Sequence, residues 1–115
     1  MLNNEIKKNF KQHIKNDLIY NVNNQEIIIN NFYYKLVDNY KNGFNFDEFV
    51  KRYSPILFKY DYIVGDWGFD QLRLKGFFSS KKKHTVPDKL ISTLEDYLYE
   101  YCNFGCSYFV LEKEK

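Results

Sequence analysis

Two carboxylates stand four residues apart in residues 61–78, whose sequence is DYIVGDWGFDQLRLKGFF. They are Asp66 and Asp70, and Gly65 and Gly68 lie beside them. Such a pair can act as a general acid and base, or can bind a divalent cation. Hard cations usually need more oxygen ligands than two carboxylates supply. The simpler interpretation is that Asp66 accepts backbone N–H groups and shapes a turn.

A basic and aromatic strip follows the carboxylates. Arg73, Lys75 and Phe77 alternate along a predicted strand, so their side chains share one face. Sheets of this kind bind single-stranded RNA, because cations contact the phosphates and rings stack on the bases. The loop after the strip adds Lys81, Lys82, Lys83 and His84, which could contact further phosphates. The alternative interpretation is a solvated face and a solvated loop.

Trp67 is the single tryptophan of the chain, and it precedes the strip. An exposed tryptophan beside a basic face would serve as a contact residue for a partner. A buried tryptophan would instead close one end of the sheet. Both interpretations remain open at this stage.

Cys102 and Cys106 form a C-x₃-C pattern at the predicted end of a helix. A structural zinc site needs four ligands, and the remaining candidates, His13 and His84, have no recognised zinc spacing. The C-x-x-C redox motif is also absent. We therefore expect two thiols, no metal and no cofactor.

The overall charge is nearly balanced. The chain carries 17 Lys and Arg against 15 Asp and Glu, a net charge of +2 that does not by itself indicate nucleic-acid binding. Lysines concentrate in residues 79–89 and acids in residues 90–115. No apolar run is long enough for a signal peptide or a spanning helix. We expect a cytoplasmic protein without a membrane partner, whose cysteines stay reduced.

A small sheet must position these side chains. Residues 26–29 and 32–37 are rich in β-branched and aromatic types, and the Asn-Asn pair between them favours a hairpin turn. Residues 60–66 and 72–78 form a second pair of predicted strands, and residues 107–111 form a last one. The apolar residues expected in the core of the second pair are Tyr62, Val64, Leu72 and Leu74.

Two helices are predicted between the strands. The first begins at Asn45, with Glu48 in the spacing of a capping box. The second begins at Ser92, with Glu95 in the same spacing, and ends before Gly105, which suits a left-handed C-cap. The order ββαββαβ predicts a single small α+β domain, with a mainly antiparallel sheet and both helices packed on it.

Residues 1–24 are expected to form an N-terminal arm, flexible or partly helical, before a domain that spans residues 25–115. The arm has apolar residues spaced by four at Ile6, Phe10 and Ile14. A stripe of three is narrow for an amphipathic helix.

Four stretches of the chain carry a family resemblance, and they are YKNGFN, RYSPIL, KYDYIVGDWGFDQLRLKGFF and ISTLEDYLYEYCNFGCSYFVL. Together they are similar to the YutD-like family of small bacterial proteins. The resemblance covers about residues 26–111 and leaves the arm outside. It implies a small cytoplasmic α+β protein and implies no reaction, so it assigns no catalytic residue.

The sequence favours a non-enzymatic binding module for RNA or a ribonucleoprotein, with the basic-aromatic strip as its face. One alternative is a protein–protein adaptor or regulator that uses exposed tyrosines, Trp67 and the acidic last helix. A second alternative is an enzyme of unrecognised class that uses Asp66, Asp70 or Cys102.

Overall fold

The structure is a computed structural model that describes residues 10–12, 18–102 and 105–114. In these residues a seven-stranded antiparallel sheet has the strand order β1-β2-β3-β4-β7-β5-β6. The strands are β1 (Phe10–Gln12), β2 (Leu18–Asn21), β3 (Glu26–Ile29), β4 (Phe32–Tyr40), β5 (Tyr62–Gly68), β6 (Gln71–Phe77) and β7 (Tyr108–Lys113). The helices are α2 (Phe46–Arg52) and α3 (Leu94–Tyr101), with 3₁₀ turns η1 (Pro55–Lys59), η2 (Pro87–Lys89) and η3 (Ile91–Thr93).

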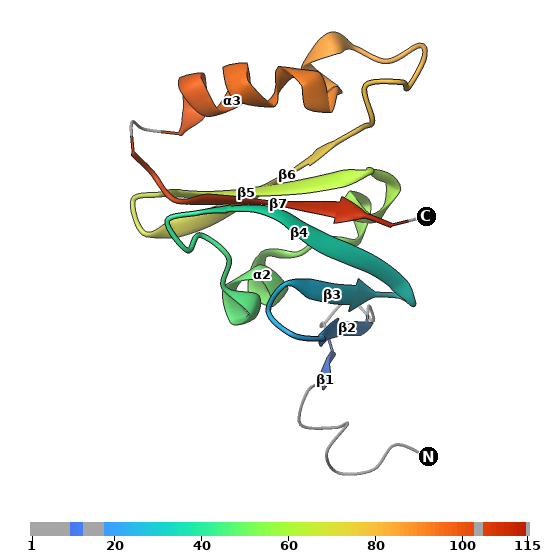
Figure 1. Ribbon diagram of the computed structural model, residues 1–115, viewed down its shortest axis with the longest axis vertical. Coiled ribbons are helices and arrows are strands. Elements are labelled where there is room, and N and C mark those ends of the chain that lie inside the picture. Colours follow the sequence, from blue (N-terminus) through green and yellow to red (C-terminus); the bar gives the residue numbers. More distant parts are fainter. Residues whose placement is uncertain (1–9, 13–17, 103–104, 115) are drawn as a thin grey trace.

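Helices α2 and α3 pack on opposite faces of the sheet (Figure 1). The face that carries α2 and η1 holds the larger core, in which Phe49 of α2 is fully buried. This core also takes buried residues from several strands, which are Ile19, Ile27, Ile29, Tyr34, Ile63, Leu72, Phe109 and Leu111. The α3 face holds a smaller core of Val64, Phe77 and Val110. The prediction of a small α+β domain with a mainly antiparallel sheet is therefore confirmed.

Local turn chemistry explains the predicted hairpin and the first helix. Asn30 and Asn31 connect β3 to β4 with φ angles of 50° and 71°. These are left-handed values that asparagine tolerates. At α2, the Oδ1 of Asn45 accepts the backbone N–H of Glu48 at 3.0 Å, as an N-cap does. Gly105 has a φ of 81°, the left-handed conformation expected after the second helix.

The start of α3 differs from its prediction. The helix begins at Leu94, directly after η3, and no side chain caps its first turn. The backbone N–H of Ser92 donates to the Oγ of Ser80 at 3.0 Å, and the Oγ1 of Thr93 donates to the carbonyl of Leu90 at 2.7 Å. The predicted capping box at Ser92 and Glu95 is therefore wrong, because tertiary and turn contacts occupy the capping groups.

The predicted boundary between arm and domain at residue 25 is also wrong. Strand β2 pairs with β3, and its Ile19 is fully buried in the larger core. Residues Phe10–Gln12 form β1 rather than part of a helix, while Ile6, His13 and Ile14 lie outside the described residues. Strand β2 has only four residues, so its alternation is too short to be recognised in the sequence without knowledge of its pairing with β3.

Across the described ranges, no helix has the length and apolar character needed to cross a membrane.

Candidate functional site

Helix α3 packs over part of the basic-aromatic strip, burying Phe77 and leaving Arg73 exposed. The register pairs Asp66 with Arg73, Val64 with Lys75 and Tyr62 with Phe77, so all six side chains lie on the α3 face. Phe77 is fully buried, and its ring centroid lies 5.6 Å from that of Tyr97 in α3. A ring in this position cannot stack on a base. The expectation that Phe77 forms part of an accessible face is therefore wrong, because the apolar side of the acidic helix packs on it.

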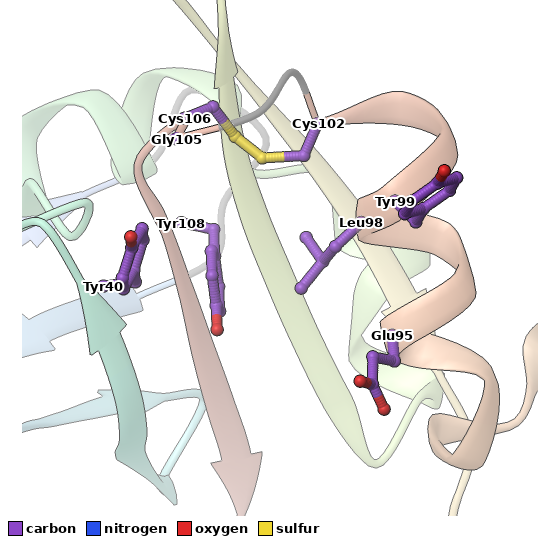
Figure 2. Close-up of a pocket in the computed structure, with 8 residues that line it drawn as sticks. All are labelled: Tyr40, Glu95, Leu98, Tyr99, Cys102, Gly105, Cys106 and Tyr108. Atoms are coloured by element: carbon purple, nitrogen blue, oxygen red, sulfur yellow. A yellow bond between two sulfur atoms is a disulfide. The ribbon is translucent and has the colours of Figure 1, made fainter.

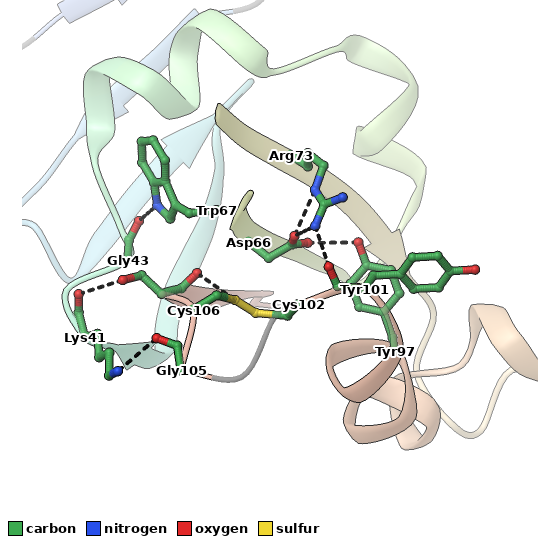
Figure 3. Close-up of a disulfide and its surroundings, with 11 residues drawn as sticks. Lys41, Gly43, Asp66, Trp67, Arg73, Tyr97, Tyr101, Cys102, Gly105 and Cys106 are labelled. Atoms are coloured by element: carbon green, nitrogen blue, oxygen red, sulfur yellow. Dashed lines mark hydrogen bonds and ion pairs between the residues drawn. A yellow bond between two sulfur atoms is a disulfide. The ribbon is translucent and has the colours of Figure 1, made fainter. Parts of the chain in front are cut away.

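A fully buried carboxylate links the strip to α3 (Figure 3). Asp66 accepts a hydrogen bond from the Nε of Arg73 at 3.0 Å, forms an ion pair with its Nη2, and accepts the hydroxyl of Tyr97 at 2.8 Å. The same Nη2 donates to the carbonyl of Tyr101 at 2.7 Å, at the end of α3. Burial, together with the hydrogen bond to Asp66, raises the pKa of Tyr97 above its usual range. The network fixes α3 on the sheet.

Asp66 is therefore neither a turn residue nor one half of a carboxylate pair. Gly65 and Gly68 belong to strand β5, and the turn that follows consists of Phe69 and Asp70. Asp70 is exposed in that turn, whereas Asp66 is buried beneath α3. The interpretation that Asp66 shapes the turn is wrong, because its position in the strand directs it into the α3 face.

The other predicted binding residues lie in three separate places. The Nζ of Lys75 lies 5.3 Å from the ring centroid of Phe77 and 5.0 Å from that of Tyr97, in cation–π geometry. Trp67 lies on the opposite face of β5, where it packs against the larger core and its Nε1 donates to the carbonyl of Gly43 at 2.7 Å. Lys81, Lys82 and Lys83 are exposed in the loop after β6. These residues do not form one continuous face.

The cysteines form a disulfide between the end of α3 and the start of β7 (Figure 3). Cys102 follows the last residue of α3 and Cys106 precedes β7, with their Cα atoms 5.9 Å apart. This separation lies within the range that a disulfide spans. The expectation of two free thiols is therefore wrong. It rested on the expected compartment, although the two cysteines are only four residues apart, on either side of the chain reversal at Gly105.

The disulfide lies at one end of a groove between α3 and the paired strands β4 and β7 (Figure 2). The groove has a volume of about 610 Å³. Its lining residues are Tyr40, Glu95, Leu98, Tyr99, Cys102, Gly105, Cys106 and Tyr108. Four of them recur along α3 and its C-cap at the i, i+3, i+4 and i+7 positions of one helical face. The groove is a mainly apolar site, because aromatic, aliphatic and disulfide groups make most of its wall.

Stacked tyrosines form the strand wall of the groove. The rings of Tyr40 and Tyr108 lie 5.3 Å apart at an interplanar angle of 25°. On the helix wall, Tyr99 is 92% exposed, which leaves nearly its whole ring accessible to a partner. Sequence reasoning did not select these residues. The spacing of Glu95, Leu98, Tyr99 and Cys102 was visible in the sequence, but the neighbouring position of β4 and β7 was not.

The two ends of the groove differ in charge. The Tyr108 hydroxyl donates to the Oδ2 of Asp38 at 3.1 Å. Burial, this bond and the nearby charges of Asp38 and Glu95 raise the pKa of Tyr108. Two carboxylates therefore lie near one hydroxyl at this end, and neither takes part in an ion pair of the described residues. At the disulfide end, the Nζ of Lys41 donates to the carbonyl of Gly105 at 2.9 Å.

The fold and the groove define a small α+β domain with an antiparallel sheet and an accessible, mainly apolar site beside its last helix. The chain belongs to the YutD-like family: residues 28–112 match the family described as "Putative antitoxin YutD-like". The resemblance found in the sequence is thereby confirmed.

A sequence match and a structural match to YutD of B. subtilis place the chain within this family. It is 59% identical over 87 residues to a protein of Bacillus subtilis (strain 168) named "Putative antitoxin YutD", and the match covers 76% of this chain and 96% of that protein. The solution NMR structure of protein yutD from B. subtilis is 57% identical, with a TM-score of 0.66, and the match covers 78% of this chain and 82% of that one.

Proposed function

We propose that this protein is a non-enzymatic binding module that holds a protein partner in the groove between α3 and strands β4 and β7. The observation that carries the proposal is the near-complete exposure of Tyr99, at 92%, beside an apolar groove of about 610 Å³. Tyrosine is enriched among the residues that dominate binding energy at protein interfaces, and such residues sit beside pockets. The name of the B. subtilis relative makes a toxin protein the partner class to test.

The geometry favours a protein partner over RNA. An RNA-binding sheet needs accessible rings for stacking, and Phe77 is buried while Lys75 lies against two rings of its own chain. The exposed lysines of the loop after β6 remain the surface that an RNA would contact. We therefore do not expect RNA binding through Asp66, Trp67 and the strip, and the nuclease treatment in the cross-linking experiment below tests for it.

The geometry also favours binding over catalysis. Asp66 forms an ion pair with Arg73 and accepts a hydrogen bond from the hydroxyl of Tyr97. Cys102 is bonded to Cys106 in the disulfide, so neither Asp66 nor Cys102 presents a free reacting group. Of the two carboxylates near the Tyr108 hydroxyl, Glu95 lines the groove and Asp38 accepts the hydrogen bond of that hydroxyl.

A photo-crosslinking amino acid at position 99 tests the proposal in native cells. Position 56 is the matched control, because Ile56 is 62% exposed and lies on η1, in the layer on the other side of the sheet. We expect one protein to be cross-linked from position 99, not from position 56, with and without nuclease treatment. A crosslink that disappears with ribonuclease, or equal products from both positions, would contradict the proposal.

The partner captured in this way allows two further measurements. With both proteins purified, Tyr99→Ala should weaken binding by about tenfold or more, as loss of an interface anchor does. For an antitoxin, expression of the partner alone should slow growth, and the unsubstituted protein should restore growth while Tyr99→Ala does not. Unchanged affinity of the variant would show that the groove is not the interface.

A further inference from the structure

We infer that the groove receives a basic segment of its protein partner, with an arginine side chain laid along the tyrosine wall and its guanidinium at Glu95 and Asp38. This inference rests on the proposed function and specifies the chemistry of the partner. The apolar wall of the groove would contact the aliphatic part of the arginine side chain, and the carboxylates at one end would contact its charge.

The groove matches the two parts of an arginine side chain. Its middle is formed by Leu98 and the ring of Tyr108, and Glu95 lies at the end opposite the disulfide (Figure 2). Arginine packs its methylene stem along apolar surface and keeps its charged head at a polar end. Its planar guanidinium also stacks on aromatic rings better than the ammonium of lysine does. The stacked pair of Tyr40 and Tyr108 offers such a surface.

The charges around the groove favour a cation and disfavour an anion. Helix α3 places Glu95 in the groove wall, and no lysine or arginine lies within Leu94–Tyr101. Its other two carboxylates, Asp96 and Glu100, line a separate hollow beside Lys75. None of these three carboxylates takes part in an ion pair of the described residues. A partner with a basic surface would thus be attracted, whereas nucleic acid would be repelled. Lys41 lies at the disulfide end, where its Nζ donates to the carbonyl of Gly105. The opposite end carries the carboxylate of Glu95.

Three blocked nonapeptides test this chemistry on the full, isotope-labelled protein. Each alternates leucine with one variable residue, which is arginine, glutamine or glutamate. NMR titration should show that the arginine peptide shifts the amide signals of Glu95, Leu98, Tyr99 and Tyr108. The glutamine peptide should bind more weakly and the glutamate peptide most weakly. Raising the salt concentration from about 50 to about 200 mM should weaken the arginine peptide most, because screening acts on the charge contact.

Glu95→Gln is the matched variant, since it removes one charge from an exposed side chain. It should weaken the arginine peptide by about two- to fivefold, the scale of one exposed ion pair, and leave the glutamine peptide unchanged. Asp70→Asn is the control, because it also removes one negative charge but does so at the β5–β6 turn. It should change the affinity of neither the arginine peptide nor the glutamine peptide. Asp70 has a φ of 65° there, which suits asparagine.

Three results would overturn the inference. They are equal affinity for the arginine and glutamine peptides, absence of shifts at the groove with the arginine peptide, and an equal effect of Glu95→Gln and Asp70→Asn. Each would leave the cross-linking result at position 99 intact. Conversely, failure of that cross-linking would reject the proposed function even if the arginine peptide bound.

Discussion

Tyr97 of α3 donates a hydrogen bond of 2.8 Å to Asp66, a carboxylate that is fully buried in β5. Arg73 reaches the same carboxylate from β6, and its Nη2 also donates to the carbonyl of Tyr101. A buried carboxylate must be paired and hydrogen-bonded, because leaving it unpaired carries a large desolvation cost. These contacts attach α3 to the sheet, and with it one wall of the groove.

Tyr97→Phe removes one donor from the buried carboxylate while keeping the ring. We expect a loss of about 1.5–3 kcal/mol in the free energy of unfolding, the scale of a hydrogen bond to a charged group. Chemical denaturation monitored by circular dichroism measures it. Tyr101→Phe is the control, because Tyr101 is 53% exposed and contributes its carbonyl to the network. Equal effects of the two substitutions would show that the hydroxyl of Tyr97 does not stabilise the fold.

Reduction of the disulfide should destabilise the protein modestly. The bond closes a short loop, with a sequence separation of 4. A loop this short restricts the unfolded chain and so adds about 2 kcal/mol to the free energy of unfolding. The measurement compares denaturation midpoints of the oxidised protein and the Cys102→Ser, Cys106→Ser variant. Mass spectrometry after alkylation without reductant is the accompanying control, and alkylation of both cysteines in the native protein would contradict the disulfide.

Phe69→Asn should stabilise the protein. Phe69 lies in the turn between β5 and β6 with a φ of 52°, and it is 95% exposed, so the substitution relieves backbone strain and removes no packing. The left-handed conformation costs an L-residue roughly 1–2 kcal/mol, and asparagine tolerates it better. We expect a gain of about 1 kcal/mol in thermal unfolding. Ile56→Asn, at an exposed site without positive φ, should give no gain, and a similar gain there would reject the explanation.

Glu26→Gln should stabilise the protein at neutral pH and not in acid. A hydrogen bond with Glu114, followed by burial and repulsion from that carboxylate, raises the pKa of Glu26 above its ordinary value of 4.5. The stability contributed by protonated Glu26 is complete below its unfolded pKa and is lost as the pH rises through its folded pKa. The difference in melting temperature between variant and native protein should therefore grow from pH 4 to pH 7. A difference that is constant with pH would contradict this coupling.

Ile19→Ala should destabilise the protein strongly, although it lies before residue 25. Ile19 is fully buried in the larger core. Removal of its side chain leaves a cavity there that costs about 2–5 kcal/mol, which denaturant unfolding measures. Leu18→Ala is the neighbouring control, because Leu18 is 36% exposed and should lose much less. Equal losses at the two positions would contradict the burial of β2.

Sequence reasoning succeeded where the determining chemistry is local. The hairpin at Asn30 and Asn31 was predictable because both residues tolerate positive φ. Alternation along β6 correctly separated Arg73 and Lys75 from Leu72 and Leu74. Of the four residues predicted for the core, Val64 and Leu72 are buried and Tyr62 and Leu74 are half-buried. Tyr62 and Val64 lie on the α3 face with Lys75, and not on the face of Leu72 as predicted.

Sequence reasoning failed where distant segments decide the outcome. Alternation assigns Phe77 to the face of Arg73, but the packing of α3 on that face decides that Phe77 is buried. Tyr40 and Tyr108 lie far apart in the sequence, and only the strand order places them side by side in the groove. The disulfide was missed for a different reason: its cysteines are separated by only four residues, but the expected compartment argued for reduced thiols.

The position of β7 also constrains the order in which the chain can fold during synthesis. This strand follows all the other described elements in the sequence, yet it lies between β4 and β5 and pairs with both. Until β7 leaves the ribosome, the β1–β4 part and the β5–β6 hairpin have no strand to join them. The sheet is therefore completed late, by contacts of large sequence separation that form slowly. A nascent chain that stalls before residue 108 would expose the unpaired edges of β4 and β5, which are sites for aggregation.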